Sequence, residues 1–171
     1  MLNQIKGLIK VVGILVLTTF TNQALANWQF GVDVLSVKSD NQKKVNALVG
    51  VVGYQFKLSD KLSIIPELSL GSGIKKRSTN EGKLKLTYYM ETAVRGRYQL
   101  SDKLFVIAGP IVNKTRYKFK NKGVSNERNG KWRLGFNGGI GYQFGTALSF
   151  ETSYSKTKDN SIWQAGLRYK F

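Results

Sequence analysis

Four basic residues stand at every second position in one part of the sequence. They are Arg116, Lys118, Lys120 and Lys122, separated by Tyr117, Phe119 and Asn121. Side chains at alternate positions of an extended chain share one face, so the four cations would form a strip. Clustered positive charge attracts anions and raises their local concentration. The spacing therefore predicts an anion-binding surface.

The rest of the composition supports an anionic partner. The chain has 27 Lys and Arg against 10 Asp and Glu, which gives a formal net charge of +17. Many of the basic residues fall in or beside the expected long loops. The candidate anion-binding set is Lys75, Lys76, Arg77, Lys114, Arg116, Lys118, Lys120, Lys122 and Arg128. The alternative interpretation is a plain solvated face that keeps the loops soluble.

The chain contains no histidine and no cysteine. This excludes disulfides, zinc fingers, a Ser-His-Asp triad and a Cys-His nucleophile. Glu67, Glu91 and Glu151 are the remaining candidates for acid–base chemistry. We expect these carboxylates instead to form structural ion pairs with Arg95, Arg97 or Arg168. The prediction is a protein that is not an enzyme and needs no metal or cofactor.

Residues 1–26 have the pattern of a secretory signal peptide. Lys6 and Lys10 precede an apolar run over 11–20, and Ala24-Leu25-Ala26 gives a small-x-small cleavage site. The alternative of an anchor helix is disfavoured, because a spanning helix needs about 20 apolar residues. We expect cleavage after Ala26 and a single mature domain over 27–171. Export also argues against nucleic acid as the partner of this basic chain.

Apolar and polar residues alternate along most of the remaining sequence. Even-numbered residues from Leu84 to Leu100, Leu86 among them, form one mainly apolar face, and the odd-numbered residues form a more polar one. Period two predicts strands. We place eight, at 28–38, 44–57, 62–74, 84–99, 103–117, 131–144, 147–156 and 161–171, joined by short turns alternating with longer polar connections at 39–43, 75–83, 118–130 and 157–160. Pro110 in the fifth strand could mark a bulge or an edge.

A short module recurs within this pattern. Tyr54-Gln55, Tyr98-Gln99 and Tyr142-Gln143 are equally spaced, and each is followed by a tight polar turn. The turns are Ser59-Asp60-Lys61, Ser101-Asp102-Lys103 and Gly145-Thr146. The repeat indicates a series of similar hairpins, with chance recurrence of a common dipeptide as the alternative.

Eight alternating strands predict an all-β, antiparallel, up-and-down barrel. A soluble barrel turns its apolar face inward, whereas a membrane barrel turns it outward. Bulky aromatics lie near the expected strand ends, which is typical of the girdles at a membrane interface. The polar faces carry both signs of charge, as a narrow interior requires. The predicted interior charge network is Asp33, Glu67, Glu91, Arg95, Arg97, Glu151 and Arg168.

The sequence ends on Arg168-Tyr169-Lys170-Phe171. With the leader, the alternation and the aromatic girdles, this ending resembles the small outer-membrane β-barrels of the OmpX/Ail-like and OmpA-barrel type. The resemblance implies a transmembrane barrel in the bacterial outer membrane, with Tyr169 and Phe171 as the signal read by the barrel-assembly machinery.

Because the chain lacks histidine, we expect a non-enzymatic surface protein. Its clustered basic residues predict loops that contact lipopolysaccharide or acidic host polymers and serve envelope integrity. The resemblance to the Ail-like group implies adhesion or serum resistance. Two alternatives remain open at this point, namely a narrow pore and a soluble periplasmic or secreted ligand-binding barrel.

Overall fold

The computed structural model describes residues 27–39, 44–74, 77–79, 82–121 and 124–171. The expected signal peptide lies outside these residues. All regular elements within them are strands: β1 (Trp28–Ser39), β2 (Val45–Tyr54), β3 (Phe56–Lys57), β4 (Leu62–Gly73), β5 (Arg77–Thr79), β6 (Gly82–Gln99), β7 (Leu104–Asn121), β8 (Val124–Asn129), β9 (Arg133–Phe144), β10 (Leu148–Thr157) and β11 (Asn160–Lys170). No helix in the described part of the chain could span a bilayer.

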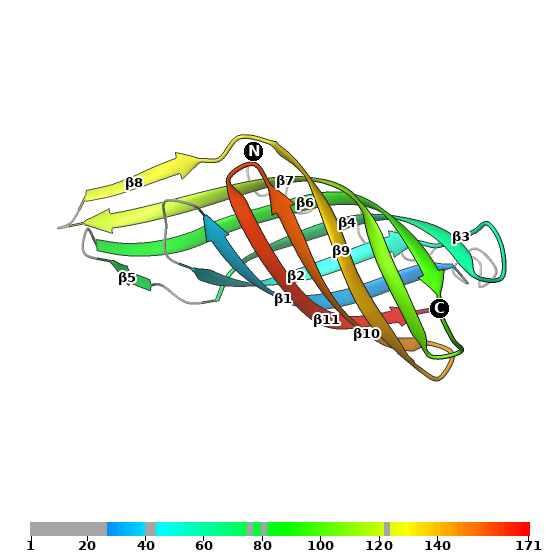
Figure 1. Ribbon diagram of the computed structural model, residues 1–171. Coiled ribbons are helices and arrows are strands. Elements are labelled where there is room, and N and C mark those ends of the chain that lie inside the picture. The colour runs from blue at the N-terminus through cyan, green and yellow to red at the C-terminus, as the bar shows by residue number, and fades with distance from the viewer. Residues whose placement is uncertain (1–26, 40–43, 75–76, 80–81, 122–123) are drawn as a thin grey trace, which may run out of the picture.

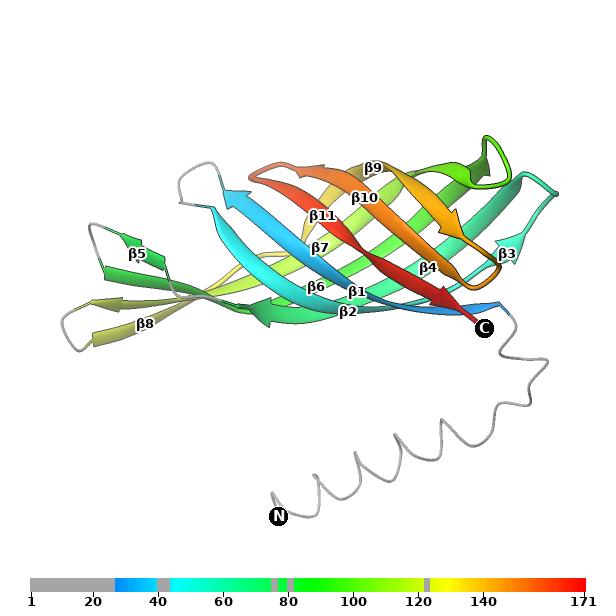
Figure 2. The same cartoon turned by 90° about the horizontal axis from the view of Figure 1, so that it is seen from below.

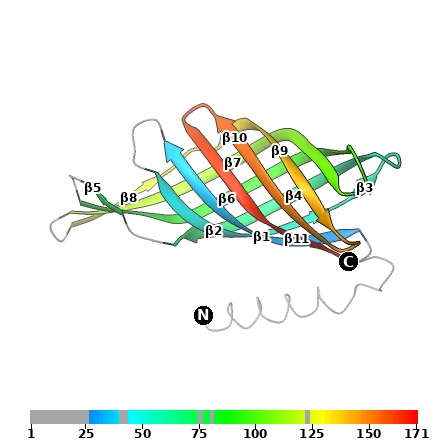
Figure 3. The same cartoon turned by 60° about the horizontal axis from the view of Figure 1, so that its bottom comes forward.

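Eight of these strands close into an antiparallel barrel. Each of β1, β2, β4, β6, β7, β9, β10 and β11 pairs with its neighbour in that order, and β1 returns to pair with β11 from Gln29–Lys170 to Ser39–Asn160. Figures 1 and 3 show the strands tilted around a common axis, with β1 beside β11. All eight predicted strands are present, and the predicted fold class is confirmed.

Three tight turns close one end of the barrel. In two of them, the turns at Ser59 and Ser101, the serine hydroxyl accepts a hydrogen bond from a backbone N–H three residues later, at 3.1 Å from Leu62 and 3.2 Å from Leu104. The third contains Gly145, whose φ of 72° lies in the left-handed region that glycine adopts without strain. Outer-membrane barrels place their short turns in the periplasm, so this is the periplasmic end.

At the opposite end of the barrel the strands extend further than the sequence predicted. The connections expected at 75–83 and 118–130 contain β5 and β8, and β7 extends to Asn121. Strand β5 pairs with β6, and β8 pairs with β7. These segments, predicted as polar connections between strands, are themselves partly strands, because they pair with the ends of β6 and β7. The extended conformation predicted for the chain around Arg116–Lys120 is present. Figure 2 shows this four-stranded ribbon projecting at the end opposite the C-terminus. We use the name basic ribbon for β5, residues 82–90 of β6, residues 113–121 of β7, and β8.

Side chains alternate between the barrel interior and the outer wall. In β2 and β10 every second residue is buried, and the residues between them are exposed or half-buried. Trp132, Phe136, Tyr142 and Phe144 all point outward, with 39–59% of their surface exposed. Aromatic pairs such as Trp28–Tyr54 and Tyr169–Phe171 pack at the periplasmic rim, with ring centroids 5.4 and 4.9 Å apart. The apolar face is therefore outside, which contradicts the alternative of a soluble barrel.

Two expectations about individual strands need correction. Leu86 was placed on the outer face, but a β-bulge between Leu86 and Tyr88 shifts the register and turns the Leu86 side chain into the interior, where it is fully buried. Pro110 marks neither a bulge nor an edge. Strand β7 pairs with both β6 and β9 there, and its register with β6 is the same on both sides of the proline.

The outward orientation can be tested at Ile140, which lies near the middle of the outer face of β9 and is 53% exposed. A lysine there would face hydrocarbon, so Ile140→Lys should reduce the free energy of unfolding in lipid vesicles by about 2–4 kcal/mol. Thr146→Lys, in an exposed turn, is the control and should change it by less than about 0.5 kcal/mol. Equal effects of the two substitutions would contradict the orientation.

Candidate functional site

The middle of the barrel interior holds two arginines surrounded by four carboxylates. Arg168 of β11 binds Asp33 of β1 through two nitrogens, one of them donating to Asp33 Oδ2 at 2.8 Å. Gln164 also donates to this oxygen, at 3.4 Å. All three side chains are buried. The pair lies diagonally across the β1–β11 seam that closes the barrel, because Arg168 is opposite Gly31 and Asp33 is opposite Gly166.

Arg95 is the second centre of charge. Its guanidinium lies 3.1 Å from Glu67, 3.7 Å from Glu91 and 3.6 Å from Glu151, and only 1% of its surface is exposed. Glu151 also approaches Arg168 Nε, at 3.8 Å, which joins the two groups into one network. The carboxylates come from β4, β6 and β10, so the network connects strands that are distant around the barrel. An ion in a narrow interior must be paired in this way, because burying it alone costs several kcal/mol.

Two glycines make room for the Arg168–Asp33 pair. A Cβ on Gly166 would lie 1.9 Å from Asp33 Oδ1, and a Cβ on Gly31 would lie 2.6 Å from the Arg168 side chain. Both distances are far below van der Waals contact. The network therefore requires glycine at these two positions. The alternation of apolar and polar residues does not predict this requirement.

Arg97 was predicted to join this network, and the structure places it elsewhere. It lies towards the periplasmic end, with its guanidinium carbon 3.5 Å from the centroid of the Phe105 ring and its Nη2 donating to Gln143 Oε1 at 2.8 Å. Within the described residues it forms no ion pair with a carboxylate. Gly141 leaves the space that the Phe105 ring occupies.

An apolar layer fills the interior between the charges and the extracellular rim. The sequence pattern does not predict this layer, because several of the strands that supply it carry apolar residues on both faces. Strand β2 shows this best, with valines pointing inward and Leu48 pointing outward. The members of this layer are Leu35, Val37, Val45, Ala47, Val49, Val51, Leu86, Tyr89, Tyr117 and Ile162.

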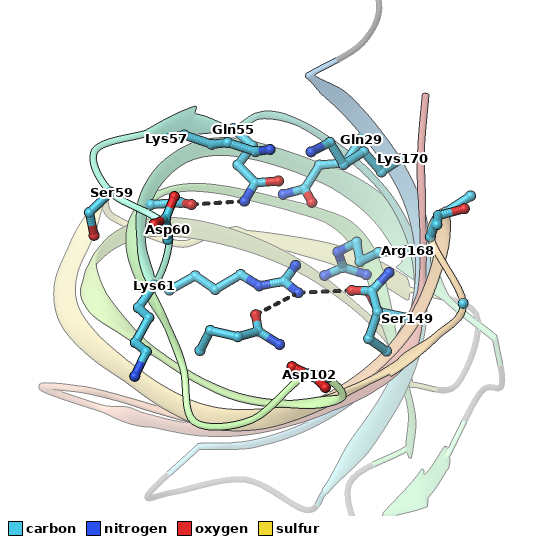
Figure 4. A pocket seen from close by; sticks show the side chains of 17 residues that line it. Gln29, Gln55, Lys57, Ser59, Asp60, Lys61, Asp102, Ser149, Arg168 and Lys170 are labelled. Carbon is cyan, nitrogen blue, oxygen red and sulfur yellow. Dashed lines mark hydrogen bonds between the residues drawn. The ribbon is translucent and has the colours of Figure 1, made fainter.

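On the periplasmic side of the charges the interior opens into a polar cavity of about 330 Å³. Figure 4 looks into this mouth, with Gln55, Gln29 and Lys170 along one wall and Asp102 across the opening. The barrel thus has a polar mouth, a charged middle and an apolar upper layer.

The structure describes part of the predicted anion-binding set. Lys114, Arg116 and Lys118 alternate with buried residues of β7 and therefore lie on the outer face. Lys114 Nζ is 5.5 Å from the centroid of the Trp132 ring. Arg77, Lys120 and Arg128 lie on strands of the basic ribbon, and only their backbone is described. Lys75, Lys76 and Lys122 fall outside the described residues.

Like charges face each other across the basic ribbon. Lys85 of β6 is directly opposite Lys118 of β7, and Lys83 is opposite Lys120 in the backbone register. Directly opposed like charges destabilise a strand pair. Glu127 of β8 is opposite Lys118 on its other side in the backbone register. The ribbon therefore carries an excess of positive charge that an anion could relieve.

Two further predictions concern other sites. In the described part of the chain, no group of three or more His, Cys, Asp or Glu is placed to hold a metal ion. Tyr169 and Phe171 point outward at the end of β11, where the Phe171 ring packs 5.5 Å from Phe30. Their role as an assembly signal stays a prediction.

Sequence comparison agrees with this architecture. The family described as "Outer membrane protein beta-barrel domain" matches residues 12–171. The chain belongs to this family. It is an outer-membrane β-barrel protein, and the predicted bacterial outer-membrane location is confirmed. No curated protein matches its sequence.

Several solved outer-membrane barrels share the fold. Ail, the attachment invasion locus protein of Yersinia pestis, aligns with a TM-score of 0.62 and 18% identity over 85% of this chain and 97% of its own. Neisserial surface protein A aligns with a TM-score of 0.60 and 17% identity over 84% and 96%. The N-terminal barrel of Pseudomonas aeruginosa OprF aligns with a TM-score of 0.51 and 14% identity over 84% and 97%. These likenesses confirm the predicted resemblance to small outer-membrane barrels.

The charge network makes Arg95 the residue whose loss should cost the barrel most stability. Arg95→Met would leave Glu67, Glu91 and Glu151 without their shared cation. We expect the free energy of unfolding in vesicles to fall by about 3–5 kcal/mol. Arg133→Met is the control, because its ion pair with Asp159, at 3.0 Å, is partly exposed and worth about 1 kcal/mol or less. If both variants lose the same stability, Arg95 is not the centre of the network.

The filled interior also predicts how the barrel behaves in a planar bilayer. Eight strands leave an interior filled by side chains rather than an aqueous passage, and here the charged and apolar layers are both buried. We expect no sustained single-channel conductance, with a reconstituted porin as the positive control. Reproducible, long-lived current steps would instead support the narrow-pore alternative.

Proposed function

We propose that this outer-membrane barrel is a non-enzymatic surface protein whose basic ribbon binds polyanions. The ligands are the phosphates and acidic sugars of lipopolysaccharide and, beyond the membrane, acidic polymers of host surfaces. Such contacts would serve envelope integrity and adhesion. We also propose that the barrel-assembly machinery is a partner of this protein and recognises Tyr169 and Phe171.

The observation that carries the proposal is the outward row Lys114–Arg116–Lys118, with Lys85 opposite Lys118. Positive charges directly opposite each other on paired strands are unfavourable, and a bound anion reduces this cost. A polyanion with regularly spaced sulfates or phosphates can contact several of these cations at once, and the linked contacts together bind it more tightly than any one of them alone.

The position of this row relative to the membrane interface favours lipopolysaccharide as one ligand. Lys114 lies beside Trp132, and tryptophan is typical of the interface between hydrocarbon and headgroups. Arg116 and Lys118 follow along the strand away from the periplasmic end. The row would therefore begin at headgroup level and continue outward, with its upper part free to meet polymers outside the cell.

A structural neighbour supports polyanions as the ligand class. Ail of Yersinia pestis has been solved in complex with the heparin analogue sucrose octasulfate, and that structure aligns with this chain with a TM-score of 0.55 and 16% identity. The ligand belongs to Ail. For the present chain the support comes from the similar fold together with its own basic ribbon.

The proposal predicts weaker heparin binding when the row is neutralised. In detergent, Arg116→Gln combined with Lys118→Gln should elute from immobilised heparin at lower NaCl concentration. The affinity for heparin should fall roughly fivefold to thirtyfold, since each exposed ion contact is worth about 0.5–1 kcal/mol.

The matched control removes the same amount of charge from outside the basic ribbon. Lys103→Gln combined with Lys158→Gln alters two exposed residues and should leave heparin elution unchanged. If the two double variants elute together, binding follows net charge and the ribbon is not the site.

A further inference from the structure

The repeated Tyr-Gln module places its tyrosines and its glutamines on opposite faces of the barrel wall. The three tyrosines point outward at the periplasmic rim, where Tyr98 and Tyr142 are 46% and 39% exposed. The three glutamines that follow them, Gln55, Gln99 and Gln143, all line the periplasmic cavity, together with Gln29, which follows Trp28. Each of these four strand ends thus places an aromatic ring on the outer wall and a side-chain amide in the mouth.

The amides are held in place and keep hydrogen-bonding capacity. Gln55 Nε2 donates to Ser63 Oγ at 2.8 Å, and Gln99 Nε2 donates to the Ser101 carbonyl at 2.7 Å. Gln143 accepts from Arg97 and donates no hydrogen bond from Nε2 within the described part of the chain. Serine and threonine side chains complete the polar lining, namely Ser59, Ser63, Thr146 and Ser149.

Positive charge predominates in the mouth. Lys57, Lys61, Arg97, Arg168 and Lys170 line it, against Asp60 and Asp102. Arg168 is neutralised by Asp33, but Lys57, Arg97 and Lys170 form no ion pair with a carboxylate in the segments that the structure describes. Like charges gathered in a cavity form a site for an anion.

We propose that the periplasmic mouth binds a small sugar that carries an oxyanion, either a carboxylate or a phosphate. Lys57, Arg97 and Lys170 would hold the oxyanion, and the amides of Gln55, Gln99 and Gln143 would hydrogen-bond the sugar hydroxyls. This site lies at the opposite end of the barrel from the basic ribbon and does not depend on the proposed function.

Three features favour a charged sugar over a bare anion or a lipid. The cavity volume of about 330 Å³ suits a ligand larger than phosphate. Amides and hydroxyls on several strands give the paired donors and acceptors that sugar hydroxyls require. Apart from Gly145 and Ala147 the lining residues are polar, and the large apolar side chains of these strand ends point to the outer wall, which disfavours an acyl chain.

The test is a titration of the folded protein in a polyoxyethylene detergent, which carries neither sugar nor phosphate. The probes are glucose 6-phosphate, glucuronate, glucose and inorganic phosphate, and the readout is the NMR shift of the glutamine side-chain amides. We expect saturable shifts with the two charged sugars at millimolar concentration, and weaker binding of glucose and of phosphate alone.

Substitutions then locate the site. Lys57→Gln combined with Lys170→Gln should weaken glucose 6-phosphate binding by about tenfold or more, since charge-assisted contacts are lost. Lys103→Gln combined with Lys131→Gln removes the same charge outside the cavity and should leave binding unchanged. The shift in gel mobility on boiling shows that each variant is folded.

Three outcomes would overturn the proposal. One is no saturable shift with either charged sugar. Another is phosphate alone binding as tightly as glucose 6-phosphate, which would indicate a simple anion site. The last is equal loss of binding in the two double variants.

Discussion

A chain that crosses hydrocarbon must satisfy its backbone hydrogen bonds internally, and a sheet achieves this only by closing on itself. In this protein the closure is the pairing of β1 with β11. The Arg168–Asp33 ion pair spans the same seam inside the barrel, while Arg95 connects β4, β6 and β10. Closure makes the interior narrow, and the narrow interior in turn requires that its charges be paired and that glycines such as Gly166 leave them room.

The same closure separates two charged surfaces that share no residues. The basic ribbon is an extension of β6 and β7 beyond the barrel, where strands need no closed sheet because water is available to their edges. The periplasmic mouth is the other end of the interior, bounded by short turns. Between them lie the charge network and an apolar layer, so binding at one end is physically isolated from the other.

For most candidate residues the side of the barrel wall could be predicted, because a side chain in a strand points either inward or outward. Once the apolar face is outward, Glu67, Glu91 and Arg95 must point inward, and so must the glutamines that follow the rim aromatics. Lys114, Arg116 and Lys118 point outward by the same rule. The place of Arg97 could not be predicted, because period two fixes a face and leaves open which inward side chains meet across the barrel.

The sequence by itself determined the strand pattern, the barrel class, the outward apolar face and the two signs of charge inside. Only the tertiary structure decided which carboxylate meets which arginine, that Leu86 turns inward at a bulge, and that β5 and β8 extend the sheet. It also brought the repeated glutamines together around one cavity. The physical reason is that alternation is a local property of the chain, whereas register, bulges and contacts across the interior depend on residues distant in sequence.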